Sequence, residues 1–400
     1  MKIFVIGAGV SSLAFCSFLD KNDITVLESN QFSGRKLLAT GNGRCNFTNI
    51  NMDHKNFYSN EKDFVNYSLD SFSNKDLLEY FEYLGIEWIN FPSGRCYPKT
   101  QSSKTVRDSL LMKAEENAKF IYNIKVVDID FKKKLIITDK KSFKYDILVI
   151  ASGGLSLKNS GSDGSILKIL KKHTKLIDQT FGITNFKTEN PLSKTAKGCK
   201  VFAKASLFVD DKFQKSSTDD IIFQSYGLTG TAILDLSNII SLALKDKRKI
   251  RLDIDFYPEY KKKGLFDILE KKAQRFPKRA IKNLLIGNID QKLIIDILKR
   301  AKINEDSVKI SKNDLEKLVK ILKKFSFNIV DIHDKNNAQV TLGGVACDRI
   351  YKNSMKSKDM ADTYFIGEIM DVAGDCGGYN IQWAFSSAKA ASDDIRRLNV

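Results

Sequence analysis

The feature that most constrains the fold is a glycine-rich turn between two short apolar runs at the start of the chain. Ile3–Ile6 leads directly into Gly7-Ala8-Gly9-Val10-Ser11-Ser12, and a second apolar run covers Ile24–Leu27. Between them, Leu13–Leu19 is rich in small and apolar residues, as in a packed helix. A strand, a glycine turn, a helix and a strand within about thirty residues predict a βαβ unit. The expected fold class is therefore α/β, built on a parallel sheet.

The glycine spacing predicts a bound dinucleotide. Gly7 permits the tight turn from strand to helix, and Gly9 lets the backbone approach a diphosphate at the helix N-terminus. Ser12 stands where a third glycine is usual, and it is small enough for the helix to pack against the strand. Glu28 follows Gly9 by 19 residues, where a carboxylate accepts hydrogen bonds from ribose hydroxyls. Because an acid there disfavours a 2′-phosphate, we expect FAD or NAD and not NADP.

Later glycine-rich segments favour FAD over NAD. Gly34-Arg35-Lys36 and the run 41–49 place two arginines and a lysine on flexible backbone, as diphosphate and ribityl groups require. Residues 367–371 and 374–380 precede the last predicted helix, whose N-terminus would stabilise negative charge on a reduced flavin; a plain helix cap is the alternative. The predicted FAD contacts are Gly7, Gly9, Ser12, Glu28, Arg35, Lys36, Gly43, Arg44, Asn46, Ala151, Gly153, Gly154, Gly367, Glu368, Asp371, Gly378, Tyr379, Asn380 and Ile381.

The middle of the chain has a different pattern. From about Phe181 to Arg251, short alternating runs separated by turn residues predict a small β-domain. From Tyr257 to about Phe325, the chain is lysine-rich and its apolar residues have helical spacing. Two modules therefore interrupt the nucleotide-binding domain.

Cysteine and histidine usage argues against metal and disulfide chemistry. The six cysteines are scattered without a CxxC pair, and the three histidines lie far apart in the sequence. These features exclude a dithiol reductase and predict a protein of the reducing cytoplasm without a metal centre. No stretch approaches the roughly 18 apolar residues of a membrane span, so no membrane partner is expected.

The net charge of +17 is concentrated in one part of the chain. Residues 245–335 include 25 basic and 14 acidic residues. Such an excess suits a polyanion such as RNA, because each phosphate neutralised releases counterions. Solvated helix faces would account for the same excess, so both interpretations stay open.

Short motifs spread over nearly the whole chain point to a family. They are Gly34-Arg35-Lys36, the Gly-x-Gly-Arg-Cys-Asn-x-Thr-Asn run at 41–49, Gly94-Arg95-Cys96-Tyr97-Pro98, Ala151-Ser152-Gly153-Gly154, Gly161–Gly164, Tyr226-Gly227-Leu228-Thr229-Gly230, Val340–Val345, Met355-Lys356-Ser357-Lys358, Tyr364–Glu368 and Gly377–Ala384. The runs 41–49 and 377–384 are the most specific. In these motifs the chain resembles the BaiN/RdsA (YhiN-like) family of FAD-dependent oxidoreductases.

The resemblance implies both an architecture and an activity. It implies a Rossmann-type FAD-binding domain (1–180 and 345–400), interrupted by a β-barrel-like domain (181–255 and 330–344) that carries a basic helical insert (256–329). It also implies a reductase of conjugated carbon–carbon double bonds. Some family members are linked to dihydrouridine formation in large-subunit ribosomal RNA, and others to steroid-like bile acid intermediates. Since the chain has one dinucleotide fingerprint, NAD(P)H would act only as a transient reductant.

Reduction of a uracil 5,6-double bond needs a hydride at C6 and a proton at C5. Cys45, Tyr379 and Cys376 are the candidate proton donors. Cys45 is the preferred one, although a packing role for this thiol is equally open. Three functions remain: reduction of an rRNA uridine docked through residues 245–335, reduction of a small-molecule enone, and RNA binding by a flavoprotein without turnover.

Overall fold

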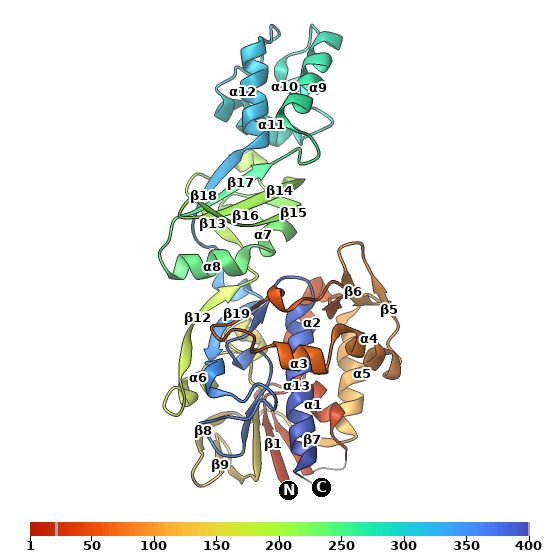
Figure 1. Ribbon diagram of the computed structural model, residues 1–400, viewed down its shortest axis with the longest axis vertical. Helices are drawn as coiled ribbons and strands as arrows, with labels where there is room; N and C mark the ends of the chain where they lie inside the picture. Colours follow the sequence, from red (N-terminus) through yellow and green to blue (C-terminus); the bar gives the residue numbers. More distant parts are fainter. Residues whose placement is uncertain (21–22, 399–400) are drawn as a thin grey trace. The chain divides into compact units, whose positions relative to one another are not determined.

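The computed structural model describes residues 1–20 and 23–398, which divide into two compact units (Figure 1). Unit 1 comprises Met1–Gly182 and Asn336–Val400, and unit 2 comprises Ile183–Lys335. Residues 336–344 were expected with the barrel but belong to unit 1. The reason is that β19 (Val340–Val345) pairs with β12 (Leu176–Gly182), antiparallel, within that unit.

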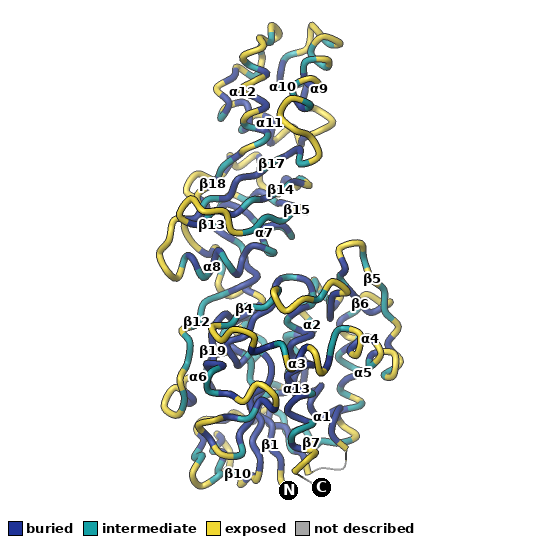
Figure 2. Tube along the Cα trace, in the orientation of Figure 1, coloured by how far each residue is buried: buried dark blue, intermediate teal, exposed yellow. Residues whose placement is uncertain are grey.

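Unit 1 is built on a five-stranded parallel sheet in the order β20-β11-β1-β2-β7. Its strands are β20 (Thr363–Phe365), β11 (Ile147–Ile150), β1 (Lys2–Ile6), β2 (Asp23–Leu27) and β7 (Ala118–Ile121). The central strands β1 and β11 are buried apolar runs, as parallel strands covered on both faces require (Figure 2). The α/β prediction is confirmed.

Helices and small sheets surround this sheet. α1 (Val10–Phe18) packs against α13 (Tyr379–Arg397), so the two ends of the chain share one core (Figure 1). The other helices of unit 1 are α2 (Arg35–Ala39), α3 (Asn66–Ser71), α4 (Asn74–Tyr83), α5 (Ser103–Glu115) and α6 (Ser165–Leu170). The small sheets contain β3 (Thr48–Asn49), β6 (Arg95–Pro98) and β5 (Trp88–Asn90); β8 (Val126–Asp130), β9 (Leu135–Thr138) and β10 (Ser142–Lys144); and β21 (Ala373–Gly374) with β4 (Phe57–Tyr58).

Unit 2 contains a closed antiparallel barrel in the order β13-β16-β15-β14-β17-β18. Its strands are β13 (Phe186–Thr188), β16 (Gly227–Thr229), β15 (Lys212–Gln224), β14 (Lys200–Val209), β17 (Ile250–Asp255) and β18 (Phe325–Ile332). Alternate residues of β14 point into the barrel, where Ala203, Ala205 and Leu207 are completely buried. Two helices, α7 (Thr231–Leu234) and α8 (Ser237–Lys245), lie in a segment for which strands alone were expected.

A helical insert follows β17 and returns to β18. It consists of α9 (Lys262–Arg275), α10 (Ile281–Leu284), α11 (Gln291–Ala301) and α12 (Lys312–Lys323) (Figure 1). Each helix buries one apolar stripe, for example Leu315, Leu318 and Leu322 of α12. A barrel with a helical insert is therefore confirmed as part of the fold.

Two negative findings apply to residues 1–20 and 23–398. No helix formed by these residues combines the length and apolarity needed to cross a bilayer. These residues also place no three His, Cys, Asp or Glu side chains in a group that could hold a metal ion.

Candidate functional site

The glycine turn between β1 and α1 has the backbone that its sequence predicted. Gly7 has a φ of +94°, and a Cβ there would lie 2.8 Å from the carbonyl oxygen of Ala151 at the end of β11. Gly9 has extended backbone, and Ala151 O, at 4.0 Å, is the nearest atom to a Cβ built on it. Helix α1 then begins without a capping side chain or an acidic residue in its first turn. Its N–H groups are therefore available to an anion.

Glu28 lies beside this turn, at the end of β2. Its buried carboxylate accepts a hydrogen bond from the backbone N–H of Ala8 at 2.7 Å. The other carboxylate oxygen accepts from the backbone and side-chain nitrogens of Asn30, at 2.8 and 2.6 Å. Arg35 in turn donates to Asn30 Oδ1 and lies 5.6 Å from the ring centre of Phe32. The structure thus brings two predicted contacts, Glu28 and Arg35, to one side of the glycine turn.

The turn after β11 has buried hydroxyl groups. Gly153 has a φ of +70°, and a Cβ there would lie 2.6 Å from Ser162 Oγ. The Oγ atoms of Ser152 and Ser162 are buried without a hydrogen-bond partner in the part of the chain that the structure describes. A buried hydroxyl without a partner costs about 1–3 kcal/mol. Polar groups of a bound ligand would remove that cost, so this turn fits a dinucleotide.

Lys36 and Glu368 form an ion pair in unit 1. Lys36 Nζ also donates to Ser156 Oγ at 2.7 Å. Glu368 accepts from Ser156 Oγ and from the backbone N–H of Thr341, both at 2.8 Å. Sequence reasoning did not select Ser156 or Thr341. Thr341 lies in one of the motifs, but a threonine in a strand suggests no particular chemistry.

The two most specific motifs contact each other. Asn46, with its amide oriented toward its partners, donates to the carbonyls of Thr48 and Cys96 and accepts from Gly378 N. Gly378 has a φ of +99°, and a Cβ there would lie 2.5 Å from Thr48 O. Thr48 also donates to Gln382 Oε1 at 2.7 Å, within α13. The run 41–49 therefore lies against the N-terminus of α13.

Side chains at the start of α13 (Tyr379–Arg397) and just before it hold the preceding turn in place. Asn380 exchanges two hydrogen bonds with the backbone of Gly374, at 2.8 and 3.0 Å. Asp371 accepts from the backbone N–H of Asn60 at 2.9 Å. Asp375, which the sequence did not single out, is buried and accepts from Tyr58 OH at 2.8 Å. Gly367 lies against α1, since a Cβ there would be 2.7 Å from Ser11 Oγ, and Ile381 is part of the core.

The candidate proton donors differ in environment. Cys45 is 0% exposed, and burial raises the pKa of its thiol to about 12. Arg44, the residue before Cys45, is exposed, with its guanidinium 5.1 Å from the ring centre of Tyr97. Gly43 before it has a φ of +81°. Tyr379 is buried and packs edge-on against Phe57 at 6.0 Å. Cys376 is half-buried.

The glycine-containing turns of the site follow adjacent strands of one parallel sheet. The turns after β1, β11 and β20 lie at the same edge, because parallel strands end on the same side. Together with Glu28 and two helix N-termini, they define a Rossmann-type dinucleotide-binding protein. The chain belongs to the family described as HI0933-like protein Rossmann domain, whose profile matches residues 1–394. The resemblance found in the sequence is thereby confirmed, and the chain is an FAD-dependent oxidoreductase.

Full-length relatives carry two different names. The chain is 28% identical to the 3-dehydro-bile acid delta(4,6)-reductase of Clostridium scindens, over 98% of each chain. It is 26% identical to the ribosomal RNA dihydrouridine synthase of Escherichia coli, over 98% of this chain and 97% of the relative. A solved structure, the 3-ketosteroid delta1-dehydrogenase of Sterolibacterium denitrificans, is 10% identical with a TM-score of 0.49, over 99% of both chains.

Proposed function

We propose that the chain reduces a uridine of large-subunit ribosomal RNA to dihydrouridine. The observation that carries this proposal is the excess of 11 basic residues in 245–335, in a chain related along its whole length to ribosomal RNA dihydrouridine synthases. Such an excess of positive charge attracts the phosphates of a polyanionic substrate, whereas an uncharged small enone gains no binding energy from it. A ribosomal substrate would place the reaction in the cytoplasm.

The residues of unit 1 fit FAD. The N–H groups at the start of α1, reached past Gly7 and Gly9, would bind the diphosphate. Glu28 would accept the ribose hydroxyls, and the N-terminus of α13 would offset negative charge on the ring system. When bound, FAD supplies the hydride for the double bond, and NAD(P)H would supply it to FAD in a transient encounter.

The proton for uracil C5 has two candidate sources in this site. The Cys45 thiol keeps its proton at neutral pH, because its pKa is raised to about 12, but it lies in the core. Tyr379 begins α13 beside the 41–49 run and is 7% exposed, whereas Cys45 is 0% exposed. Loss of turnover in Cys45→Ala with retained FAD would identify the thiol, and loss in Tyr379→Phe would identify the phenol.

A second candidate function is reduction of a steroid-like enone, which the bile acid reductase relative favours. Nucleoside mass spectrometry of ribosomal RNA from a strain lacking this protein tests the first proposal. Loss of dihydrouridine at one position supports it. Unchanged dihydrouridine, with salt-independent turnover of an enone by the purified protein, supports the second. Flavin that NAD(P)H cannot reduce, with or without substrate, would indicate RNA binding without turnover.

A further inference from the structure

The positive charge of unit 2 is concentrated in one segment without acidic residues. Residues 271–282, here called the cationic turn, cover the end of α9, the following turn and the start of α10. Its six basic residues are Lys271, Lys272, Arg275, Lys278, Arg279 and Lys282. The part of the insert that follows, residues 283–324, is more balanced, with 10 basic and 6 acidic residues. The cationic turn therefore accounts for much of the charge excess of this region.

An aromatic ring organises two of these cations. The guanidinium carbon of Arg279 lies 3.8 Å from the ring centre of Phe276, and that of Arg275 lies 5.7 Å from it. The backbone fixes their spacing, since Phe276 N donates to Lys272 O at 3.1 Å and Arg279 N donates to Phe276 O at 3.0 Å. Cation–π contact limits the freedom of both guanidiniums before any ligand arrives.

The charge of the cationic turn is largely unneutralised. Arg275, Lys278 and Arg279 are exposed, and none of them forms an ion pair with a residue that the structure describes. Of the other basic residues of the turn, Lys282 pairs with Asp306 at 2.5 Å. Elsewhere in the insert, Lys323 pairs with Asp255 at 2.6 Å. Burial, and then the positive charge of Arg279, lower the pKa of Lys272. A cationic surface of this kind attracts an anion.

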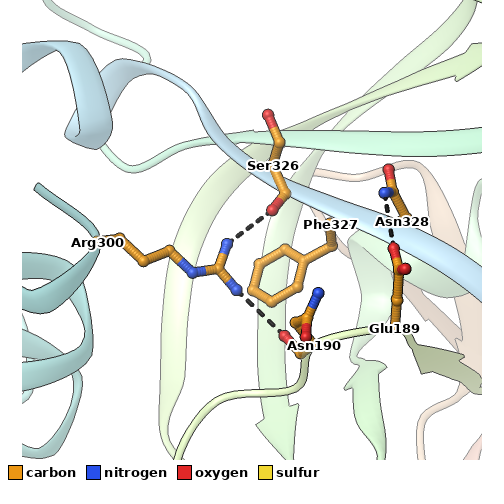
Figure 3. A pocket seen from close by; sticks show the side chains of 6 residues that line it. All are labelled: Glu189, Asn190, Arg300, Ser326, Phe327 and Asn328. Atoms are coloured by element: carbon orange, nitrogen blue, oxygen red, sulfur yellow. Dashed lines mark hydrogen bonds between the residues drawn. The ribbon is translucent and has the colours of Figure 1, made fainter.

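The insert that carries the cationic turn is fixed to the barrel. Arg300 of α11 donates to Ser326 O at 2.7 Å and to Asn190 O at 3.1 Å. These three residues line one pocket (Figure 3). The Arg300 guanidinium also lies 4.2 and 4.6 Å from the ring centres of Phe325 and Phe327. Arg300 therefore joins the helical insert to the barrel within unit 2.

We propose that the cationic turn binds the phosphate backbone of RNA, through Arg275, Lys278 and Arg279. This inference rests on the proposed rRNA substrate and says where unit 2 holds it. Guanidinium groups bind phosphate with paired hydrogen bonds. A membrane fits less well, because no large apolar side chain of residues 271–282 is among the exposed ones.

The test compares two triple variants of the full-length holoprotein. The first, Arg275→Gln/Lys278→Gln/Arg279→Gln, removes the proposed phosphate contacts. The matched control, Lys309→Gln/Lys312→Gln/Lys320→Gln, removes three basic residues elsewhere in the insert. Binding of deproteinised large-subunit rRNA is measured from about 50 to 300 mM salt. We expect the first variant to lose at least tenfold in affinity and about two from the slope of log affinity against log salt, and the control to lose much less.

The outcomes separate this inference from the proposed function. If the wild-type protein binds rRNA steeply with salt and the two variants behave alike, the cationic turn is not the docking surface, while the rRNA proposal stands. If the wild-type protein does not bind rRNA, both fail. If the first variant loses binding to phosphatidylglycerol vesicles but not to rRNA, the surface recognises lipid and the inference is overturned. Equal FAD content and melting temperature show that each variant is folded.

Discussion

Lys36 and Glu368, separated by 332 positions in the sequence, form an ion pair that joins α2 to the turn after β20. Their side chains are 23% and 20% exposed, so the pair is partly desolvated. Both residues were predicted to contact FAD directly. In the structure Glu368 also accepts from Thr341 N, so the carboxylate links the turn after β20 to β19. The pair therefore has a structural role whether or not it also touches the cofactor.

Lys36→Met should destabilise unit 1 by about 1–3 kcal/mol, because Glu368 would keep a partly buried charge without its cation. Glu368→Gln should cost less, since an amide oxygen still accepts from Thr341 N. The double variant should cost less than the sum of the two single changes. Urea unfolding measures all three. Lys99→Met, which breaks the exposed pair with Glu87, is the control and should leave stability close to that of the wild type. Additive costs would show that the two charges are independent.

Gly7→Ala and Gly9→Ala should separate folding from cofactor binding. At Gly7, alanine would need a φ of +94° and would press against the backbone of Ala151, so the protein itself should lose stability by about 1–3 kcal/mol. At Gly9, alanine meets no close atom and the φ of −76° suits it. We expect Gly9→Ala to unfold like the wild type without FAD, yet to bind FAD at least tenfold more weakly. Full FAD affinity in Gly9→Ala would place the diphosphate elsewhere.

The sequence predicted the parts of the site that depend on local backbone. The turn at Gly7–Gly9 and the acid at Glu28 follow from spacing along one βαβ unit, and the structure has both. The sequence marked the 41–49 run and the start of α13 as two specific motifs, but it did not predict that they contact each other. Residues more than 300 positions apart meet there through tertiary packing. Thr48 and Gln382, which form a buried hydrogen bond there, have no sequence pattern that indicates a pair.

Helix α8 shows why part of the barrel module was predicted wrongly. Its run Asn238-Ile239-Ile240-Ser241 is rich in β-branched residues, which favour strands. The buried residues Ser237, Ile240, Ser241 and Ala243 nevertheless recur at helical spacing, and packing within unit 2 decides the conformation. Likewise, the sequence left Cys45 open as a proton donor or a packing residue, and the structure shows that it is completely buried.

Alkaline pH should destabilise the protein through its buried thiols. Burial raises the thiol pKa of Cys16 and of Cys45 to about 12, whereas the unfolded chain ionises these groups near pH 9. Between these values the unfolded state binds fewer protons, so the free energy of unfolding falls as pH rises, by up to about 1.4 kcal/mol per pH unit for each thiol. Urea unfolding from pH 8 to 10.5 should show a shallower slope for Cys45→Ala than for the wild type. An unchanged slope in Cys45→Ala would contradict the burial of that thiol.

Arg300→Lys should loosen the helical insert while leaving the barrel intact. Lysine keeps the positive charge, but it cannot donate to both Ser326 O and Asn190 O while lying flat against two aromatic rings. We expect a loss of about 1–3 kcal/mol, seen as faster amide hydrogen exchange in α11 and little change in β14. Lys299→Ala, at the exposed neighbouring position, is the control and should exchange like the wild type. If Arg300 positions the insert for RNA, Arg300→Lys should also weaken rRNA binding without lowering its salt slope, because the phosphate contacts remain while their arrangement becomes less fixed.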